Sequence, residues 1–156
     1  MVLWSANGST GSLAMYDYRV LPWPQKVDKY PESWPEAVGR FWLQAQRSLK
    51  DENWDAAAVM ARSAMQVALR HQGASGNNLK QEIDSVSDKG ALPPLMKEWA
   101  HELRELGNDS AHPDPAQSAT VPQDAKDIAR YLDFLLTYLY DLPREIAQYR
   151  ERRAEK

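Results

Sequence analysis

Apolar residues in this chain recur at intervals of three and four positions, and this helical period constrains the fold more than any other feature. It appears in five segments, at about 33–50, 54–69, 79–86, 92–106 and 124–142. Glycine, proline or short polar stretches separate these segments, and none of them alternates with the period of two that a strand requires. The sequence therefore predicts an all-α fold, a helical bundle of four to five helices without a sheet.

Several helix ends carry recognisable signals. Ser33 precedes Pro35 and Glu36, a combination typical of a helix start with serine as the N-cap. Gly107 predicts the end of the fourth helix, because glycine readily adopts the left-handed conformation that closes many helices. Pro143 predicts a kink or a restart after the fifth helix.

Three regions are expected along the chain. Residues 1–32 contain glycine, serine, proline and aromatic residues without a helical period, which predicts an extended or partly disordered arm. Residues 33–143 form the helical domain, and residues 144–156 form a charged helical tail with a basic cluster. The most apolar run, at 134–140, is far shorter than the roughly 20 residues that cross a bilayer, so no membrane association is expected.

The chain is long enough to bury a core. Its 156 residues fit one domain, and six tryptophans and seven tyrosines supply large apolar rings. The apolar faces of the helices place Trp42, Leu69, Trp99 and Leu135 in this core. Trp23, Tyr30 and Trp34, in the extended segment VLPWPQKVDKYPESWP, are expected to pack against the helices.

Composition excludes several function classes. A net charge of −3 gives no general attraction to phosphate, so nucleic-acid binding would need a local basic patch. The absence of cysteine excludes disulfides, thiolate zinc sites and a cysteine nucleophile, and it fits the reducing cytoplasm. The three histidines lack the spacing of metal ligands, and nucleotide-binding glycine motifs are absent. We therefore expect a cytoplasmic protein without a metal site or a cofactor.

The segment RELGNDSAH, residues 104–112, is the strongest candidate for a site. Arg104, Asn108 and His112 can converge on one pocket if the helix runs through Arg104 and then turns. Arginine offers a fork of donors to phosphate, histidine moves protons near neutral pH, and asparagine orients either group. The alternative is a structural helix end, with Gly107 and Asn108 in the closing turn and Arg104 on the terminal carbonyls. Such helix ends are common, and residue types and spacing alone favour this alternative.

Four stretches together resemble a known family. They are YPESWPEAVGRFWLQAQRSL, WDAAAVMARSAMQVAL, LRELGNDSAH and PQDAKDIARYLDFLLTYLYDLP. The chain resembles an uncharacterised domain family of the HEPN superfamily, which is also found at the C-terminal end of some type I restriction-enzyme motor subunits. The resemblance covers roughly residues 20–145.

This resemblance implies two long antiparallel helices beside a shorter pair, usually assembled as a homodimer. Many relatives in the superfamily are metal-independent ribonucleases in toxin–antitoxin, restriction and antiphage systems, with a motif of arginine, a polar residue and then histidine. Asn108 and His112 fit its second half, whereas Gly107 stands at the arginine position and Arg104 lies one turn earlier. Arg62 matches a recurrent basic position of the family, and Gln66 stands where the family often has glutamate.

Two hypotheses follow. In the first, the chain is a metal-independent ribonuclease or nucleic-acid-processing domain in bacterial defence or stress response, and it binds RNA. His112 is the acid/base, Arg104 holds phosphate and Asn108 completes the catalytic site. In the second, it is a non-catalytic helical module in which RELGNDSAH is a structural helix end, and the aromatic arm and the tryptophan-rich helices form a homodimer or bind a protein partner.

Overall fold

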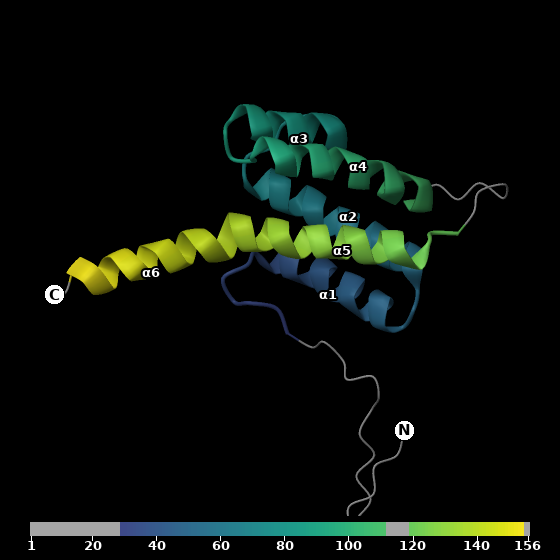
Figure 1. The fold of residues 1–156 in the computed structure, drawn as a ribbon, viewed down its shortest axis with the longest axis horizontal. Coiled ribbons are helices and arrows are strands. Elements are labelled where there is room, and N and C mark those ends of the chain that lie inside the picture. The colour runs from purple at the N-terminus through teal and green to yellow at the C-terminus, as the bar shows by residue number, and fades with distance from the viewer. Residues whose placement is uncertain (1–28, 112–118, 155–156) are drawn as a thin grey trace, which may run out of the picture.

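The computed structural model describes residues 29–111 and 119–154, and over 106–111 it describes the backbone only (Figure 1). This part of the chain is helical and contains no strand, which confirms the predicted all-α bundle. Its elements are α1 (Glu36–Lys50), α2 (Trp54–His71), α3 (Leu79–Asp88), α4 (Pro94–Ala111), α5 (Pro122–Leu136), the π-helical turn η1 (Thr137–Asp141) and α6 (Leu142–Ala154).

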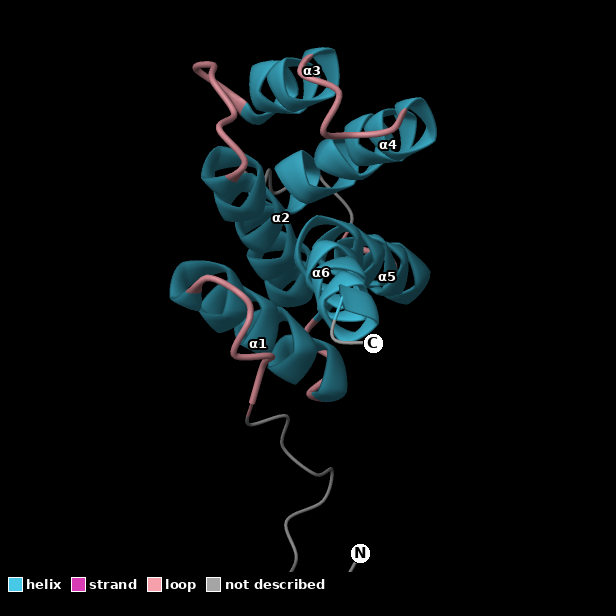
Figure 2. Cartoon of the chain, turned by 90° about the vertical axis from the view of Figure 1, so that its left-hand side faces the viewer, coloured by secondary structure: helices cyan, strands magenta, loops and turns pink. Residues whose placement is uncertain are grey.

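Helix α2 lies at the centre of the bundle. It forms an antiparallel hairpin with α1, and it also packs against α3, α4 and α5 (Figures 1 and 2). The side of α2 that faces these neighbours consists mainly of alanine, and five of its alanines are completely or almost completely buried. Small side chains let neighbouring helix axes approach to about 8 Å, so one helix can contact four others.

The predicted core is confirmed in two places and corrected in two. Leu69 and Leu135 are fully buried, whereas Trp42 and Trp99 are only partly buried. The indole Nε1 of Trp42 donates to Oδ1 of Asp133 at 2.6 Å, and the ring of Trp99 packs edge-on against Tyr131. A large ring with a polar N–H is well suited to the edge of a core, where one side packs and the other reaches a polar partner.

The predicted N-cap at Ser33 is wrong. Pro35 occupies the N-cap position of α1 without a side-chain cap. Ser33 Oγ instead donates to Oδ1 of Asp141 at 3.4 Å, and the indole of the buried Trp34 donates to the same oxygen at 2.9 Å. The residues before α1 are therefore attached to η1, more than 100 positions later in the sequence.

The end of the arm packs against α1 as expected. The ring of Tyr30 occupies the space in which a β-carbon on Gly39 would lie, so only glycine at that position allows this contact. The rest of the predicted arm, including Trp23, lies outside the described residues.

The restart predicted at Pro143 takes the form of the π-helical turn. Proline at 143 has no N–H to donate to the carbonyl four residues earlier, and its ring crowds that carbonyl. The wider turn of η1, in which the Leu142 N–H bonds to the Thr137 carbonyl, precedes this proline and lets the helix continue. As a result, α6 extends past the ends of the other helices (Figure 1).

Asp84 joins α3 to α4 and makes folding sensitive to acid. Its carboxylate accepts from Lys97 Nζ at 2.8 Å and lies 3.2 Å from His101 Nε2. The hydrogen bond from Lys97, and secondarily that from His101, lowers the pKa of Asp84 below its ordinary value of 3.8. A carboxylate whose pKa is lower in the folded state stabilises the fold above its unfolded pKa and loses this effect as the pH falls through the folded pKa.

We therefore expect Asp84→Asn to lower the free energy of unfolding more at pH 5 than at pH 2. Because Asp84 is partly exposed, the loss at pH 5 should be below about 1 kcal/mol. Urea unfolding at the two pH values measures it, with Asp51→Asn in the α1–α2 turn as the control. An equal loss at both pH values would show that the ion pairs of Asp84 are not the cause.

Candidate functional site

The structure describes the three predicted catalytic residues to different extents. Arg104 lies on α4 with 16% of its side chain exposed. Asn108 is one turn further along the same helix, where only the backbone is described, and His112 lies outside the described residues. The predicted convergence of all three therefore stays a prediction.

The predicted helix end at Gly107 is wrong. Helix α4 continues through Gly107 and Asn108 to Ala111, so neither residue forms a left-handed closing turn. Glycine inside a helix costs only about 1 kcal/mol, which the buried contacts of Ala100 and Leu103 on the preceding turns can offset. Positions 104 and 108 are thus four residues apart on one helix and share a face.

Arg104 lines a pocket at the meeting point of three helices. The pocket has a volume of about 270 Å³. Arg62 contributes from α2, Arg104 from α4, and Asn78, Leu79 and Lys80 from the start of α3. Three of its five lining residues are cationic, so the chain has a local basic patch despite its net negative charge.

The start of α3 adds to the positive potential of this pocket. Asn78 is the N-cap, and its Oδ1 accepts from the Gln81 N–H at 3.0 Å. The first N–H groups of a helix have no partner within the helix, and they carry the positive end of its dipole. The two arginines and the start of α3 therefore favour the same kind of ligand, an anion.

Both arginines are in an unfavourable electrostatic environment. Their Nε atoms are buried and have no hydrogen-bond partner among the described residues. Burial lowers the pKa of Arg62, and the positive charge of Arg104 lowers it further, while the negative charge of Glu82 opposes both effects. One terminal nitrogen of Arg104 bonds to the exposed carboxylate of Glu105.

Glu82 supplies the buried negative charge beside this pocket. It is the only charged residue among the described ones that is buried, with 1% of its surface exposed. Its carboxylate accepts from Gln66 Nε2 at 2.8 Å and from Arg70 Nε at 2.6 Å, which attaches α3 to two successive turns of α2. Glu82 thereby fixes the helix start that forms one wall of the pocket.

A family model described as "Domain of unknown function (DUF4145)" matches residues 43–152. The chain belongs to this family. The match begins in α1 and ends in α6, so every residue that lines the arginine pocket lies within the DUF4145 domain. No curated protein and no solved structure matches the chain significantly.

Part of the pocket of this DUF4145 domain has no clear signal in the sequence. Asn78 and Lys80 belong to a stretch whose pattern predicts only a helix break followed by a short helix. Their position beside Arg62 and Arg104 depends on tertiary packing. Glu82 does have a signal, because it lies in the apolar stripe of α3 between Leu79 and Val86. A charged residue on a buried helix face needs a partner, and this rule could have identified it.

Among residues 29–105 and 119–154, no three histidine, aspartate or glutamate side chains lie close enough to hold a metal ion together. No helix within the described ranges is both long and apolar enough to span a bilayer.

Proposed function

We propose that this chain is a HEPN-like RNA-processing domain whose arginine pocket holds a phosphate of the RNA backbone. The observation that carries the proposal is the pair Arg62 and Arg104, two guanidinium groups that line one pocket beside a helix start. The HEPN resemblance supports RNA as the source of the phosphate. We further propose that it acts in the cytoplasm, as a homodimer, in bacterial defence or stress response.

A phosphate suits this pocket better than a neutral ligand. An anion between the two guanidinium groups offsets their repulsion and offers acceptors to their donors, and guanidinium matches the geometry of phosphate oxygens. Asn78 and Lys80 add polar groups on the α3 side. Gln66, which stands where the family often has glutamate, donates to Glu82, so α3 supplies the acidic group of this site.

The proposed chemistry uses the 2′-hydroxyl of the RNA as the nucleophile. The 2′-oxygen forms a bond to the adjacent phosphorus, the bond from phosphorus to the 5′-oxygen breaks, and a 2′,3′-cyclic phosphate and a 5′-hydroxyl result. His112 accepts or donates the proton in this exchange, Asn108 orients His112 or the phosphate, and Arg104 and Arg62 stabilise the charge on the phosphate.

Binding of a short single-stranded RNA to alanine variants tests the phosphate site. Arg62→Ala and Arg104→Ala should each lower the affinity about 10- to 100-fold, because each removes charged hydrogen bonds worth about 1.5–3 kcal/mol. Each should also reduce the slope of log affinity against log salt by about 0.7, the value for one phosphate contact on a single strand. Fluorescence anisotropy at several salt concentrations measures both quantities.

Arg40→Ala is the matched control for this binding experiment. Arg40 is an exposed arginine on α1 that stacks over Phe41 and does not line the pocket. If Arg40→Ala weakens binding as much as Arg62→Ala does, the RNA is attracted by general charge and the proposed site is wrong. If wild-type protein binds no RNA, the second hypothesis, a non-catalytic helical module, replaces this one.

A further inference from the structure

Helix α6 has an apolar face that the described chain leaves about half exposed, with Arg153 of the same helix stacked over the ring of Tyr149. No residue of α6 is buried, and Leu142, Ile146 and Tyr149 are 42–53% exposed. Their spacing of four and three residues places them along one side of the helix. A monomer gains nothing by exposing three large apolar side chains in a row, so this side is a candidate interaction surface.

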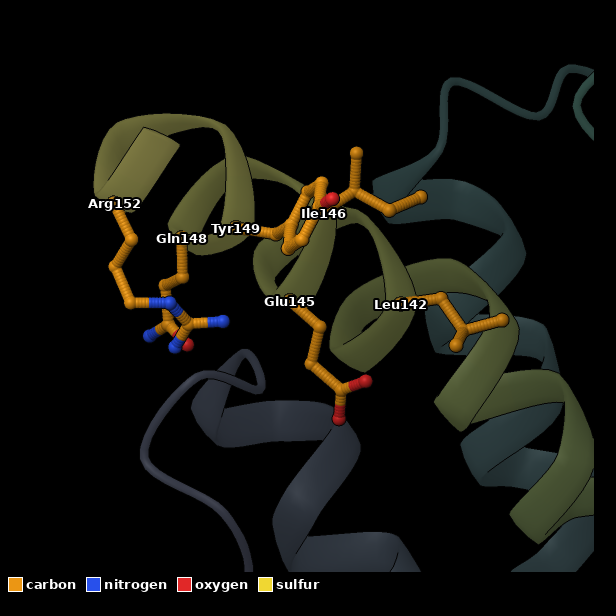
Figure 3. A pocket seen from close by; sticks show the side chains of 6 residues that line it. All are labelled: Leu142, Glu145, Ile146, Gln148, Tyr149 and Arg152. Atoms are coloured by element: carbon orange, nitrogen blue, oxygen red, sulfur yellow. The ribbon is translucent and has the colours of Figure 1, made fainter. Parts of the chain in front are cut away.

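Charged and polar side chains border this apolar row. Glu145, Gln148 and Arg152 line the same shallow hollow, of about 400 Å³, as the three apolar residues. Figure 3 shows Glu145, Gln148 and Arg152 projecting to one side of α6, with Tyr149 above them. We call the six residues that line this hollow the α6 face. Their positions correspond to a, d, e and g of a heptad, the set that contacts a partner helix in a coiled coil.

The charges of the α6 face are complementary to those of the α6 face of a second, antiparallel copy. Glu145 lies near its start and Arg152 near its end, seven residues or about 10 Å apart along the axis, which is too far for a pair within one helix. When two such faces meet antiparallel across a two-fold axis, each Glu145 comes close to the Arg152 of the other copy. In this register Ile146 and Tyr149 of the two copies lie opposite one another near the two-fold axis, whereas Leu142 lies closer to Arg152 of the other copy.

We propose that the α6 face is a self-association surface whose occupant is the α6 face of a second copy of this chain. Nucleic acid suits this face poorly, because the carboxylate of Glu145 lies on it and repels phosphate. The proposal is independent of the arginine pocket, which α2, α3 and α4 form. It names the surface through which two copies meet, and it holds whether or not the protein binds RNA.

The size of the surface sets the expected strength of the dimer. A helix of 13 residues is about 20 Å long, and a contact one helix wide over that length falls short of the roughly 1,200 Å² of a standard stable interface. We therefore expect reversible association that depends on protein concentration and weakens with salt.

Sedimentation of the full chain over a range of concentrations tests the proposal. Glu145→Arg places like charges together at both ends of the paired helices, and so does Arg152→Glu. Each single variant should raise the dissociation constant of the dimer more than about tenfold, because like charges across an interface are strongly unfavourable. The double variant, with the two charges exchanged, should restore the wild-type constant.

Mixing the two single variants distinguishes self-association from other causes. In a mixed dimer of Glu145→Arg with Arg152→Glu, every charge again meets its opposite, so the mixture should associate although neither variant does so alone. Glu151→Arg and Arg150→Glu make the same changes in charge outside the α6 face, and they should leave association unchanged. RNA affinity should be unaltered in the double variant.

Four results would overturn the proposal. A wild-type protein that stays monomeric at high concentration would mean that another segment or another partner covers the α6 face. A dimer that tolerates Glu145→Arg would place the interface elsewhere. Mixed variants that remain monomeric, or control variants that dissociate equally, would show that net charge and not pairing of the two faces governs association.

Discussion

Replacing His112 by alanine is expected to lower the rate of cleavage of single-stranded RNA by about 10²–10⁴, the usual contribution of a general acid or base. The reason is chemical, because histidine is the residue of RELGNDSAH that can both take and give a proton near neutral pH. In the sequence, His112 directly follows the last residue of α4, the helix that also carries Arg104. The measurement is the rate at saturating RNA, by gel or fluorescence release.

The effect of His112→Ala should differ in kind from that of Arg104→Ala. The arginine variant should mainly raise KM, because Arg104 holds phosphate, while the histidine variant should mainly lower kcat. An RNA with a single 2′-deoxy nucleotide at the cleaved position should resist cleavage, because it lacks the nucleophile. A chelator should leave the rate unchanged, because no step of the proposed reaction uses a metal.

Cleavage that survives His112→Ala would eliminate the proposed acid/base. Wild-type protein that binds RNA but does not cleave it would remove the catalytic part of the proposal and leave the phosphate site intact. The binding experiment with Arg62→Ala and the cleavage experiment with His112→Ala therefore fail independently.

The helical fold was predictable because each described helix carries its own apolar stripe. Leu79, Ile83 and Val86 on α3, and five of the six alanines of α2, show the period of three and four and are buried as expected. Such patterns are local, so one helix can be recognised without knowing its neighbours.

Helix ends were predicted less well because tertiary contacts decide them. Ser33 has the residue type of an N-cap, yet its hydroxyl bonds to Asp141, which is remote in the sequence. Gly107 has the residue type of a C-terminal stop, yet α4 continues past it. In both cases a modest local preference, of about 1 kcal/mol, is smaller than the packing energy of a whole helix.

The candidate site was only half predictable for a related reason. The sequence pointed to Arg104 because it lies in the polar segment RELGNDSAH, and to Arg62 because it matches a recurrent basic position of the resembling family. Nothing local connects either of them to Lys80 or Glu82, since the pocket exists only because α3 folds back against α2 and α4. The sequence alone therefore could not show that Arg62 and Arg104 line the same pocket.

Glu82→Ala is the second change for which we expect a large effect, a loss of about 3 kcal/mol in the free energy of unfolding. Removing one partner of a buried ion pair usually costs about 3–5 kcal/mol, because the remaining charge is left without compensation. The lower end applies here, because Arg70 is 59% exposed on its side chain and regains water when Glu82 is lost. Arg62, whose charge Glu82 also stabilises, is more buried than Arg70, so it gains less hydration when Glu82 is lost.

Glu105→Ala is the matched control for Glu82→Ala. Glu105 also pairs with an arginine of the pocket, but 62% of its side chain is exposed, so its removal should cost less than about 1 kcal/mol. Urea unfolding of both variants measures the difference. Equal losses would show that Glu82 does not compensate the arginines of the pocket.

Phosphate should partly restore the stability of the Glu82→Ala variant. Without Glu82, the positive charges of Arg62 and Arg104 have no buried counter-charge among the described residues, so an anion in the pocket stabilises the folded state more than in the wild-type protein. A ligand at free concentration c that binds only the folded state stabilises it by RT ln(1 + c/Kd), so at one phosphate concentration tighter binding raises the melting temperature more. The melting temperature of Glu82→Ala should therefore rise more with phosphate than that of the wild type, at constant ionic strength held with chloride. Adding Arg62→Ala to both proteins should remove this difference in the response to phosphate. A difference that persists without the Arg62 side chain would place the phosphate outside the arginine pocket.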